Sequence, residues 1–528
     1  MKTSDYKVLI TTSGVGSRLG EATQYTNKAL IAIGPKPVIS YIIEAYPKET
    51  RFVITLGHFG RLVKDYLRIA YPQRSFTFVE VDPHQGRGSS LGFSMLQAEK
   101  NLQEPFIYHA SDTIVKQRIP APQKNWIGGF AGQGSSNYTS FNLLNGKIQK
   151  IMDKGILDPD YLHIGLVGVY DFRKFWKSLK KLYKNNTFKE SLSDYHVLND
   201  LIEDGTDINI QEFTTWYDTG NTEPLIKARQ ELGGSFYNLD KLDESIFIID
   251  NKKVIKFYSD GSLVRQRVER AKVLKGLVPK IQLSSENFMS YSFIRGDLFA
   301  DVANPVNFVK FMYWSFKNLW KPVGEVSYRE FRSRCRDFYF NKTNDRISQF
   351  FKKKKIKDSE NVINGLKVPK VSKMIDQIDF GWLSDAEQSN FHGDFILDNI
   401  IKTRNGFCLL DWRPNFGGLL KAGDIYYDLA KLNHNLIINH SVISRNLFEV
   451  RISGENINCD LLVKENLLQC QNVLFDFLSR KGYDLKKIKL LTSLVWFRSA
   501  PLHHEPYDSF LFYFAKLNLW RILNNKQL

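Results

Sequence analysis

Short apolar runs alternate with amphipathic segments over the first hundred residues of the chain. The apolar runs have the length of buried strands, and the segments between them place apolar residues at helical spacing. Strands and helices in alternation build a mainly parallel sheet with helices on both faces, so the pattern predicts an α/β domain. The predicted strands are residues 8–12, 51–56, 75–81 and 105–109, and the predicted helices are residues 37–46 and 62–70.

The same alternation weakens after about residue 114 and ends in a glycine-rich segment. Gly233-Gly234-Ser235 follows the last predicted helix, at 222–232, and adjacent glycines are typical of a helix C-cap and a linker. We therefore expect a first domain over residues 1–232, a linker at 233–235 and a second domain over residues 236–528. The remaining predicted elements are a strand at 161–172, a basic helix at 173–183, a strand and turn at 211–219, and two antiparallel strands at 245–250 and 253–258.

Length, composition and charge are those of a multidomain globular protein. A chain of 528 residues is too long for one hydrophobic core, and 43% apolar residues exclude a disordered chain. The net charge of +17 is spread, with 28 Lys and Arg against 23 Asp and Glu in residues 1–230 and 45 against 33 in the rest. Only the four lysines at 352–355 form a run, which is typical of a solvated surface. We expect phosphate-bearing substrates and no nucleic-acid partner.

Cysteine spacing and hydropathy favour an intracellular protein. The four cysteines are scattered without a CxxC pair, so neither a disulfide framework nor a zinc site is predicted. No apolar run approaches the roughly 20 residues that span a bilayer, and the first residues lack the apolar core of a signal peptide. The sequence therefore predicts a cytoplasmic protein without membrane insertion.

A glycine-rich turn, Ser-Gly-Val-Gly-Ser-Arg-Leu-Gly at 13–20, follows the first predicted strand. Gly14, Gly16 and Ser17 lie where backbone amides can approach an anion, and the next helix end adds partial positive charge. Arg18 and Lys28 supply two full cations for phosphate groups. Such a turn also occurs as a plain connection between strand and helix, so the interpretation depends on the segments that follow.

Three later segments accompany the turn: Ala-Ser-Asp-Thr at 110–113, Asp153-Lys154, and Trp-Tyr-Asp-Thr-Gly at 216–220. Together with the turn they resemble the nucleotidylyltransferases that join an NTP to a sugar phosphate or to phosphocholine. The resemblance covers about residues 7–232 and implies a Rossmann-like domain; Asp153 stands where the family often has Glu. Attack of a phosphomonoester on the α-phosphorus needs charge neutralisation and in-line positioning rather than a nucleophilic side chain. The resemblance implies that Arg18 and Lys28 act in catalysis, Asp112 and Asp218 hold Mg²⁺, and Lys154 contacts the acceptor phosphate.

The loop that reads the nucleobase is expected at 85–90, with Gln85 and Gly88 contacting the nucleotide. Its sequence does not match one base, so CTP, UTP and dTTP all remain open.

A second set of phosphoryl-transfer residues lies in two segments, Phe-His-Gly-Asp-Phe-Ile-Leu-Asp-Asn at 391–399 and Leu-Leu-Asp-Trp-Arg at 409–413. Phosphoryl transfer to a hydroxyl needs a carboxylate over that hydroxyl and oxygen ligands for Mg²⁺. With Gly-Asp-Ile-Tyr-Tyr-Asp-Leu-Ala at 423–430, these segments resemble the choline kinase and aminoglycoside phosphotransferase family. The resemblance implies that Asp394 is the catalytic base, that Asn399 and Asp411 bind Mg²⁺, and that the domain is a kinase-like α+β fold. Its small β-rich lobe would span about 236–296 and its helical lobe 297–528.

The contacts to ATP and to the acceptor are less defined. Lys256 and Glu269 stand where the family keeps a lysine for the ATP phosphates and its carboxylate partner, although an ordinary strand lysine and helix glutamate are the alternative. No glycine-rich loop precedes Lys256. Acceptor-pocket candidates, which could also be plain core residues, are Trp412, Arg413, Trp496, His503, His504, Tyr507 and Tyr513.

The two sites together predict consecutive reactions with Mg²⁺ as cofactor. ATP and a small hydroxyl compound X would give X-phosphate, and an NTP and X-phosphate would give NDP-X and pyrophosphate, for decoration of a surface polysaccharide or lipid. X could be choline or another amino alcohol with CTP, or a sugar phosphorylated at its anomeric hydroxyl with UTP or dTTP. The remaining alternative is a chain in which one domain has become a nucleotide-binding regulatory module.

Overall fold

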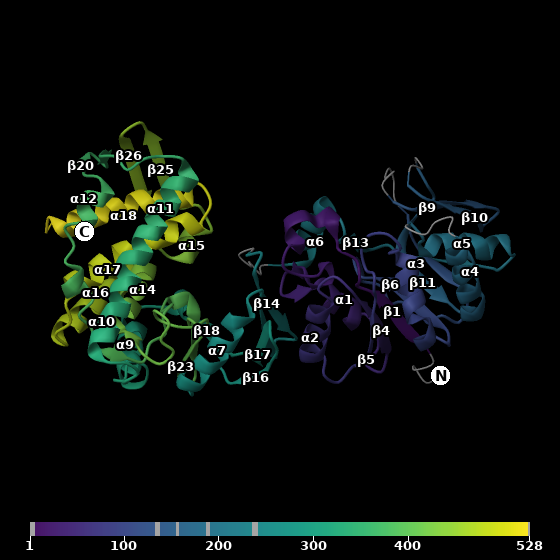
Figure 1. Cartoon of the computed structure of the whole chain (residues 1–528), viewed down its shortest axis with the longest axis horizontal. Helices are drawn as coiled ribbons and strands as arrows, with labels where there is room; N and C mark the ends of the chain where they lie inside the picture. Colours follow the sequence, from purple (N-terminus) through teal and green to yellow (C-terminus); the bar gives the residue numbers. More distant parts are fainter. Residues whose placement is uncertain (1–5, 132–137, 155–157, 186–190, 235–240, 526–528) are drawn as a thin grey trace. The chain divides into compact units, whose positions relative to one another are not determined.

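The computed structural model describes residues 6–131, 138–154, 158–185, 191–234 and 241–525. The chain forms two compact units (Figure 1). The first comprises Met1–Gly261 and Gln282–Phe293, and the second comprises Ser262–Ile281 and Ile294–Leu528.

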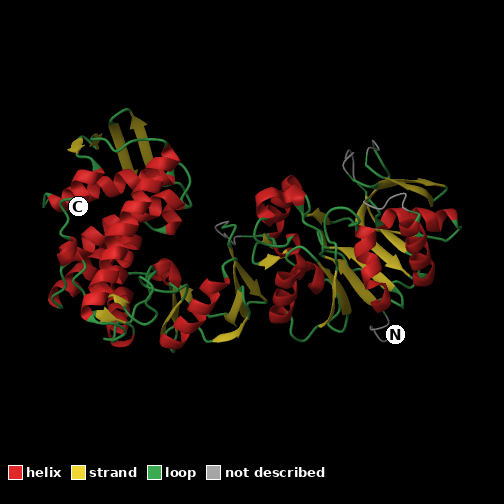
Figure 2. Ribbon diagram, in the orientation of Figure 1, coloured by secondary structure: helices red, strands yellow, loops and turns green. Residues whose placement is uncertain are grey.

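The first unit is built on a nine-stranded sheet whose parallel part confirms the predicted alternation of strands and helices (Figure 2). Successive residues of one strand face opposite sides, so Val8 and Ile10 pack in one core while Leu9 packs in the other. Helices α1 (Val38–Glu44) and α2 (Gly60–Ala70) contribute to the first of these cores. The parallel strands, in the order β6-β1-β4-β5, are β6 (Phe106–Ala110), β1 (Lys7–Thr11), β4 (Arg51–Leu56) and β5 (Ser75–Glu80).

Beyond β6 the same sheet continues with mixed strand directions. Strand β11 (Tyr161–Val169) runs antiparallel to β6, and four shorter strands extend the sheet beyond β11. The opposite core contains side chains of α3 (Leu91–Ala98), α4 (Phe172–Lys184) and α5 (Asp194–Glu203). The four shorter strands are β8 (Trp126–Phe130), β9 (Ser140–Leu144), β10 (Lys147–Met152) and β12 (Asn209–Glu212).

A small two-stranded sheet joins distant parts of the first unit. Strand β7 (Thr113–Val115), directly after β6, pairs antiparallel with β13 (Trp216–Asp218), which precedes α6 (Thr222–Leu232). Because Asp218 is opposite Thr113 in this register, the pairing brings the segment at 216–220 to the carboxyl end of β6.

A separate four-stranded sheet also belongs to the first unit, which differs from the division predicted at 233–235. The hairpin of β14 (Glu244–Ile249) and β15 (Lys253–Tyr258) turns at Asp250 and Asn251, both at positive φ. Phe247 and Phe288 pack with Tyr66 of α2, so the sheet shares the core of the preceding domain. Ser235 lies outside the described residues. The order is β14-β15-β17-β16, with β17 (Phe288–Ser292) and β16 (Ile281–Ser284).

The second unit is mostly helical. Helix α17 (Leu485–Ser499) is buried on nearly all sides because it packs against both α14 (Ile425–Ile437) and α18 (Tyr507–Leu523). A three-stranded sheet of β18 (Asp297–Leu298), β22 (Ile400–Thr403) and β23 (Gly406–Leu409) carries the segment predicted to be catalytic. The other long helices are α7 (Gly261–Val273), α9 (Pro305–Asn318), α10 (Tyr328–Arg336), α11 (Lys342–Lys354) and α16 (Glu465–Arg480).

Helices α10 and α11 are joined by a π-helical turn, Asp337–Asn341.

The kinase-like fold that the sequence implies for the second unit stays a prediction. Of the helices in the described ranges, none combines the length and the apolar character needed to cross a bilayer.

Candidate functional site

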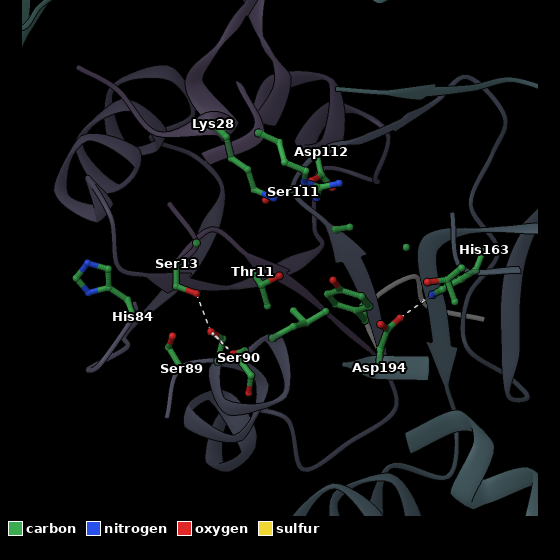
Figure 3. A pocket seen from close by; sticks show the side chains of 18 residues that line it. Thr11, Ser13, Lys28, His84, Ser89, Ser90, Ser111, Asp112, His163 and Asp194 are labelled. Carbon is green, nitrogen blue, oxygen red and sulfur yellow. Dashed lines mark hydrogen bonds and ion pairs between the residues drawn. The ribbon is translucent and has the colours of Figure 1, made fainter. Parts of the chain in front are cut away.

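A cavity of about 470 Å³ opens in the first unit where β1 and β6 end (Figure 3). Its lining includes Thr11 at the end of β1, Ser13 just after it, and Ser111 and Asp112 after β6. The crevice at the carboxyl ends of parallel strands is the usual ligand site of open α/β sheets. Gly14, Arg18 and Lys28, all predicted from the sequence, line the same cavity.

Lys28 and Asp112 form the central ion pair of this cavity, with 2.7 Å between Nζ and Oδ2. Lys28 is the first residue of the short 3₁₀ helix η2 (Lys28–Leu30). Asn27 caps this helix, and the side-chain amide of Asn27 also donates to the carbonyl of Thr12. Burial alone would raise the pKa of Asp112, but the charges of Lys28 and Arg18 lower it below the ordinary value. The carboxylate is therefore ionised at neutral pH and available to a cation.

Asp218, the last residue of β13, brings a second carboxylate close to that of Asp112. Its Oδ1 accepts a hydrogen bond of 2.8 Å from the Gly220 amide, and its Oδ2 accepts one of 2.8 Å from the Tyr138 hydroxyl. A Cβ added at Gly220 would lie 2.8 Å from Asp112 Oδ2 and 3.2 Å from Asp218 Oδ1. Two converging carboxylates fit Mg²⁺, which is commonly held by one or two carboxylates together with substrate phosphates.

Replacing Gly220 with alanine should obstruct the space beside the Asp112 and Asp218 carboxylates without disturbing the fold. The new methyl group would press on Asp112 Oδ2, and a displacement of about 1 Å near a reacting centre can cost about 10²-fold in rate. We expect nucleotidyl transfer to fall by about that factor while the thermal unfolding temperature changes little. Gly324→Ala is the control, because a Cβ there meets nothing within 4 Å; equal activity of both variants would contradict the shared carboxylate site.

Only some residues of the glycine-rich turn and of the expected base-reading loop line the cavity. Gly16 has φ 72°, and a Cβ there would lie 3.2 Å from Lys28 Cβ, so this position needs glycine to pack against the lysine. Ser17 is exposed and starts the 3₁₀ helix η1 (Ser17–Thr23). Gln85 is exposed, and Gly88 has φ 90°. Ser89 and Ser90 of that loop line the cavity, as does His84 just before it.

Lys154 is not among the residues that line the cavity. It is exposed just after β10, and residues 155–157 lie outside the described ranges. Its contact with an acceptor phosphate remains a prediction.

A buried histidine–aspartate pair on the cavity wall was missed by the sequence analysis. His163 Nε2 lies 2.7 Å from Asp194 Oδ2, and the Ser193 hydroxyl donates to Asp194 Oδ1 at 2.7 Å. Burial would raise the pKa of Asp194, but the His163 ring beside it lowers the pKa below the ordinary value. A histidine in an apolar strand and an aspartate at a helix start carry no motif, so no sequence signal pointed to them.

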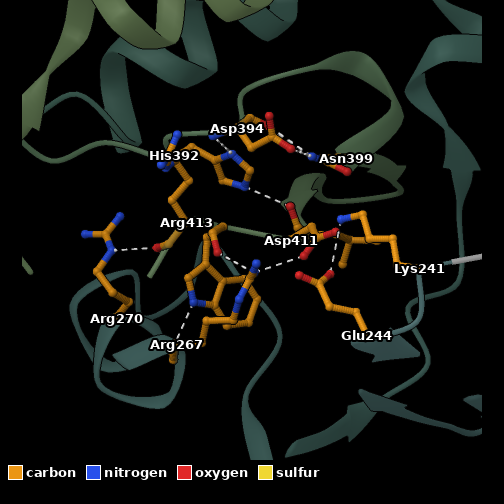
Figure 4. A network of polar contacts seen from close by, with 11 residues as sticks. Lys241, Glu244, Arg267, Arg270, His392, Asp394, Asn399, Asp411 and Arg413 are labelled. Atoms are coloured by element: carbon orange, nitrogen blue, oxygen red, sulfur yellow. Dashed lines mark hydrogen bonds and ion pairs between the residues drawn. The ribbon is translucent and has the colours of Figure 1, made fainter. Parts of the chain in front are cut away.

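In the second unit, Asp394 lies in a polar network, of which Figure 4 shows the contact with Asn399. Lys431 of α14 approaches Asp394 Oδ1 at 2.8 Å, and the Asn399 amide group donates to Asp394 Oδ2 at 3.0 Å. Partial burial would raise the pKa of Asp394, but the charge of Lys431 lowers it to about 2. The carboxylate is ionised at neutral pH, as a proton acceptor must be.

Asp428 fixes the backbone that presents Asp394. Its two oxygens accept hydrogen bonds from the amides of His392 (2.8 Å) and Gly393 (2.6 Å) and from the Trp320 indole (3.0 Å). His392 Nε2 lies 2.8 Å from the carbonyl of Leu410, and burial lowers the pKa of His392 to about 4. A neutral, hydrogen-bonded His392 therefore braces the loop and joins it to the segment that carries Asp411.

Asp411 stands next to this loop in the left-handed conformation, with φ 59°. Arg267 of α7 approaches Asp411 Oδ1 at 2.9 Å and donates to the carbonyl of Trp412 at 2.6 Å. The charge of Asp411 acts against that of Lys431 and raises the pKa of Asp394. The Asn399 nitrogen is engaged with Asp394, which leaves the amide oxygen for a metal; with Asp411 this donor set fits Mg²⁺. The sequence analysis missed Arg267, which no motif marks.

The predicted ATP contacts fall in different units. Lys256 is buried on β15 in the first unit, whereas Glu269 lies on α7 in the second and pairs with Lys272 at 2.6 Å. The role assigned to Lys256 and Glu269 remains a prediction. Of the acceptor candidates, Trp412 and Trp496 are buried in the interior of the second unit.

Comparison with known proteins identifies relatives of the amino-terminal region. No family model matches the sequence. A low-salt glycan biosynthesis nucleotidyltransferase of Haloferax volcanii is 24% identical over 240 residues, which is 42% of this chain and 65% of that protein. A probable glucose-1-phosphate cytidylyltransferase of Bacillus subtilis is 28% identical over 147 residues, 26% of this chain and 54% of that protein. The chain thus spans between half and two thirds of the length of these curated relatives.

Two solved structures also align with 43% and 45% of the chain. They are a CTP:phosphocholine cytidylyltransferase of Streptococcus pneumoniae (19% identity, TM-score 0.38, 99% of that chain) and a putative glucose-1-phosphate thymidylyltransferase of Bacillus anthracis (20% identity, TM-score 0.38, 98% of that chain). On the sequence matches, the amino-terminal region of this chain is similar to nucleotidyltransferases.

Proposed function

We propose that the chain is a bifunctional enzyme that phosphorylates a small hydroxyl compound X and then couples X-phosphate to a nucleotide. The second unit transfers the γ-phosphoryl group of ATP to X, and the first unit uses an NTP and X-phosphate to form NDP-X and pyrophosphate. The observation that supports this most strongly is the presence, in each unit, of an ionised carboxylate paired to a lysine and close to a further residue that would hold Mg²⁺.

In the phosphorylation step, Asp394 accepts the proton of the X hydroxyl as that oxygen bonds to the γ-phosphorus. The bond between the γ-phosphorus and the bridging oxygen of ATP breaks, and ADP leaves. Lys431 keeps Asp394 ionised and in place through the 2.8 Å ion pair. Mg²⁺, held by Asn399 and Asp411, would neutralise the phosphate charge.

In the nucleotidyl step, a phosphate oxygen of X-phosphate bonds to the α-phosphorus of the NTP and pyrophosphate leaves. No side chain has to act as a nucleophile, because the acceptor already carries an ionised oxygen. Arg18 and Lys28 neutralise charge on the triphosphate, and Asp112 and Asp218 would hold Mg²⁺ against it. The His163–Asp194 pair lies on the wall of the same cavity and would contact the acceptor.

CTP is the favoured nucleotide, since one curated relative is named as a cytidylyltransferase. The alternative is a sugar 1-kinase joined to a UTP- or dTTP-dependent transferase of the sugar 1-phosphate. NDP-X would serve in decoration of a surface polysaccharide or lipid, in line with the other relative, which is named for glycan biosynthesis.

Release of pyrophosphate in complete and incomplete mixtures tests the proposal. With Mg²⁺, ATP, one of CTP, UTP or dTTP, and a panel of hydroxyl compounds, we expect pyrophosphate only when all components are present. With a supplied X-phosphate, ATP should become dispensable. Pyrophosphate release that never depends on ATP would instead support the alternative in which the second unit is a regulatory nucleotide-binding module.

A further inference from the structure

Three cations of the second unit surround one aromatic ring. The guanidinium of Arg498 lies 4.1 Å from the centroid of Phe338, that of Arg413 lies 5.2 Å away, and the amine of Lys342 lies 5.0 Å away. Arg346 follows one turn after Lys342 on α11, and its charge acts on both Lys342 and Arg498. We refer to Lys342, Arg346, Arg413 and Arg498 as the basic cluster.

The basic cluster lacks carboxylate partners in the part of the chain that the structure describes. None of its four members forms an ion pair there, and Arg413 Nε is buried without a hydrogen-bond partner. Arg498 is only 8% exposed. Burying unpaired like charges together is unfavourable, and cation–π contacts with Phe338 offset only part of that cost. A bound anion would neutralise this excess of positive charge.

The titration behaviour of the cluster agrees with this geometry. Burial and repulsion from Arg413 and Arg498 lower the pKa of Lys342 to about 7. Burial also lowers the pKa of Arg498. Phe338 itself lies in the π-helical turn between α10 and α11, and such turns occur frequently at functional sites.

The basic cluster adjoins the loop that carries Asp394. The amide of Arg413 donates to the carbonyl of His392 at 3.0 Å, and a Cβ added at Gly393 would lie 2.7 Å from the Arg413 side chain. The Arg413 guanidinium also donates to the Tyr427 hydroxyl at 3.0 Å. One turn after Tyr427 on α14 is Lys431, the ion-pair partner of Asp394.

We propose that the basic cluster binds a carboxylate or phosphate group of the same molecule whose hydroxyl faces Asp394, so that the acceptor X is an anionic hydroxyl compound. This inference rests on the proposed kinase function of the second unit. A quaternary ammonium compound such as choline is disfavoured, because the faces of Phe338 and Tyr427 that would attract it are already occupied by guanidinium groups.

Acceptor kinetics with matched compounds test the proposal. Glucuronate supplies a carboxylate, glucose 6-phosphate a phosphate, glucose no charge, and choline a positive charge. We expect kcat/KM for one of the two anions to exceed that for glucose by about 10- to 100-fold, the range of one or two charge-assisted hydrogen bonds. Arg498→Met should remove that advantage mainly through KM, whereas Arg329→Gln, an exposed control on α10, should not. Preferred phosphorylation of choline or glucose would overturn the inference and leave the kinase proposal standing.

Binding without turnover separates the two proposals. Calorimetric titration with glucuronate and with glucose 6-phosphate, at saturating Mg²⁺–ADP, should show Arg498-dependent binding of one of them. Such binding without phosphorylation of any compound would support the anion site and count against the kinase. The same titration is repeated without ADP. Binding of the anion that is seen only without ADP would overturn the inference, because the cluster would then serve the nucleotide phosphates.

Two further readouts distinguish ligand binding from a structural role of the cluster. If glucuronate is the anion that binds, it should bind more tightly at pH 6 than at pH 8, because its own charge is constant in this range while Lys342, with a pKa of about 7, gains its charge. Removing the unpaired charge by Arg498→Met should leave the melting temperature of the free protein unchanged or higher. A lower melting temperature with unaltered acceptor kinetics would show that the cluster only stabilises the fold.

Discussion

Asp394→Asn should reduce phosphorylation of X by about 10²- to 10⁴-fold, the usual contribution of a positioned general base. The asparagine keeps the shape of the side chain but cannot accept the hydroxyl proton. It also ends the ion pair with Lys431, which holds the carboxylate at 2.8 Å in the wild-type protein. The measurement is the initial rate of ADP formation that depends on X.

The control for this variant is Asp376→Asn, which removes an exposed carboxylate at the end of a short helix of the same unit. That variant should phosphorylate X at the wild-type rate. Nucleotidyl transfer from supplied X-phosphate should be normal in both variants. If Asp394→Asn retained full phosphorylation, Asp394 would not be the proton acceptor.

Asp112→Asn should reduce nucleotidyl transfer by about 10²- to 10³-fold, the range found when one electrostatic stabiliser of a transition state is removed. The substitution removes the charge that pairs with Lys28 and that, together with Asp218, would hold Mg²⁺. Pyrophosphate release from an NTP and supplied X-phosphate is the measurement, repeated over a range of Mg²⁺ concentrations.

Phosphorylation of X by the Asp112→Asn protein should remain at the wild-type rate. Asp207→Asn, at an exposed carboxylate of the first unit, is the matched control and should leave both reactions intact. Loss of both activities in Asp112→Asn, with an unchanged melting temperature, would contradict independent sites.

The parallel part of the first sheet could be predicted because each of its elements has an unambiguous periodicity. Arg51–Leu56 and Thr222–Leu232 end where the sequence predicted, since a polar turn or a glycine bounds each of them. The strands β8 to β10 escaped prediction for two reasons. The hairpin signal Asn145-Gly146, a two-residue turn that joins β9 to β10, was not used in the prediction from sequence. Strand β8 pairs with β11 and β12, which come much later in the chain, so no local pattern reveals its place. The assignment of the second sheet to the first unit depends on packing of Phe247 and Phe288 against Tyr66, which no local pattern reveals.

Some of the site residues could likewise be predicted from the sequence, and others could not. Asp112 and Arg18 come together because their motifs follow β6 and β1, which end at one edge of the sheet, and Lys28 joins them from η2, the next short helix after the glycine-rich turn. His163, Asp194 and Arg267 were missed, since each reaches its site from an element whose local sequence has no special composition. The basic cluster was likewise hidden: it assembles from α11, α17 and the segment after β23, and only the fold brings these cations to one ring.

Mixing the two inactive variants tests the central claim, two independent active sites acting in sequence, most directly. With ATP, Mg²⁺, the NTP and X, neither Asp112→Asn nor Asp394→Asn alone should form NDP-X, as followed by ³¹P nuclear magnetic resonance. The Asp112→Asn protein alone should accumulate X-phosphate. An equal mixture of the two should form NDP-X, because the phosphomonoester made by one protein is consumed by the other. A mixture that forms no NDP-X although X-phosphate accumulates, or either variant alone carrying out both steps, would contradict the account.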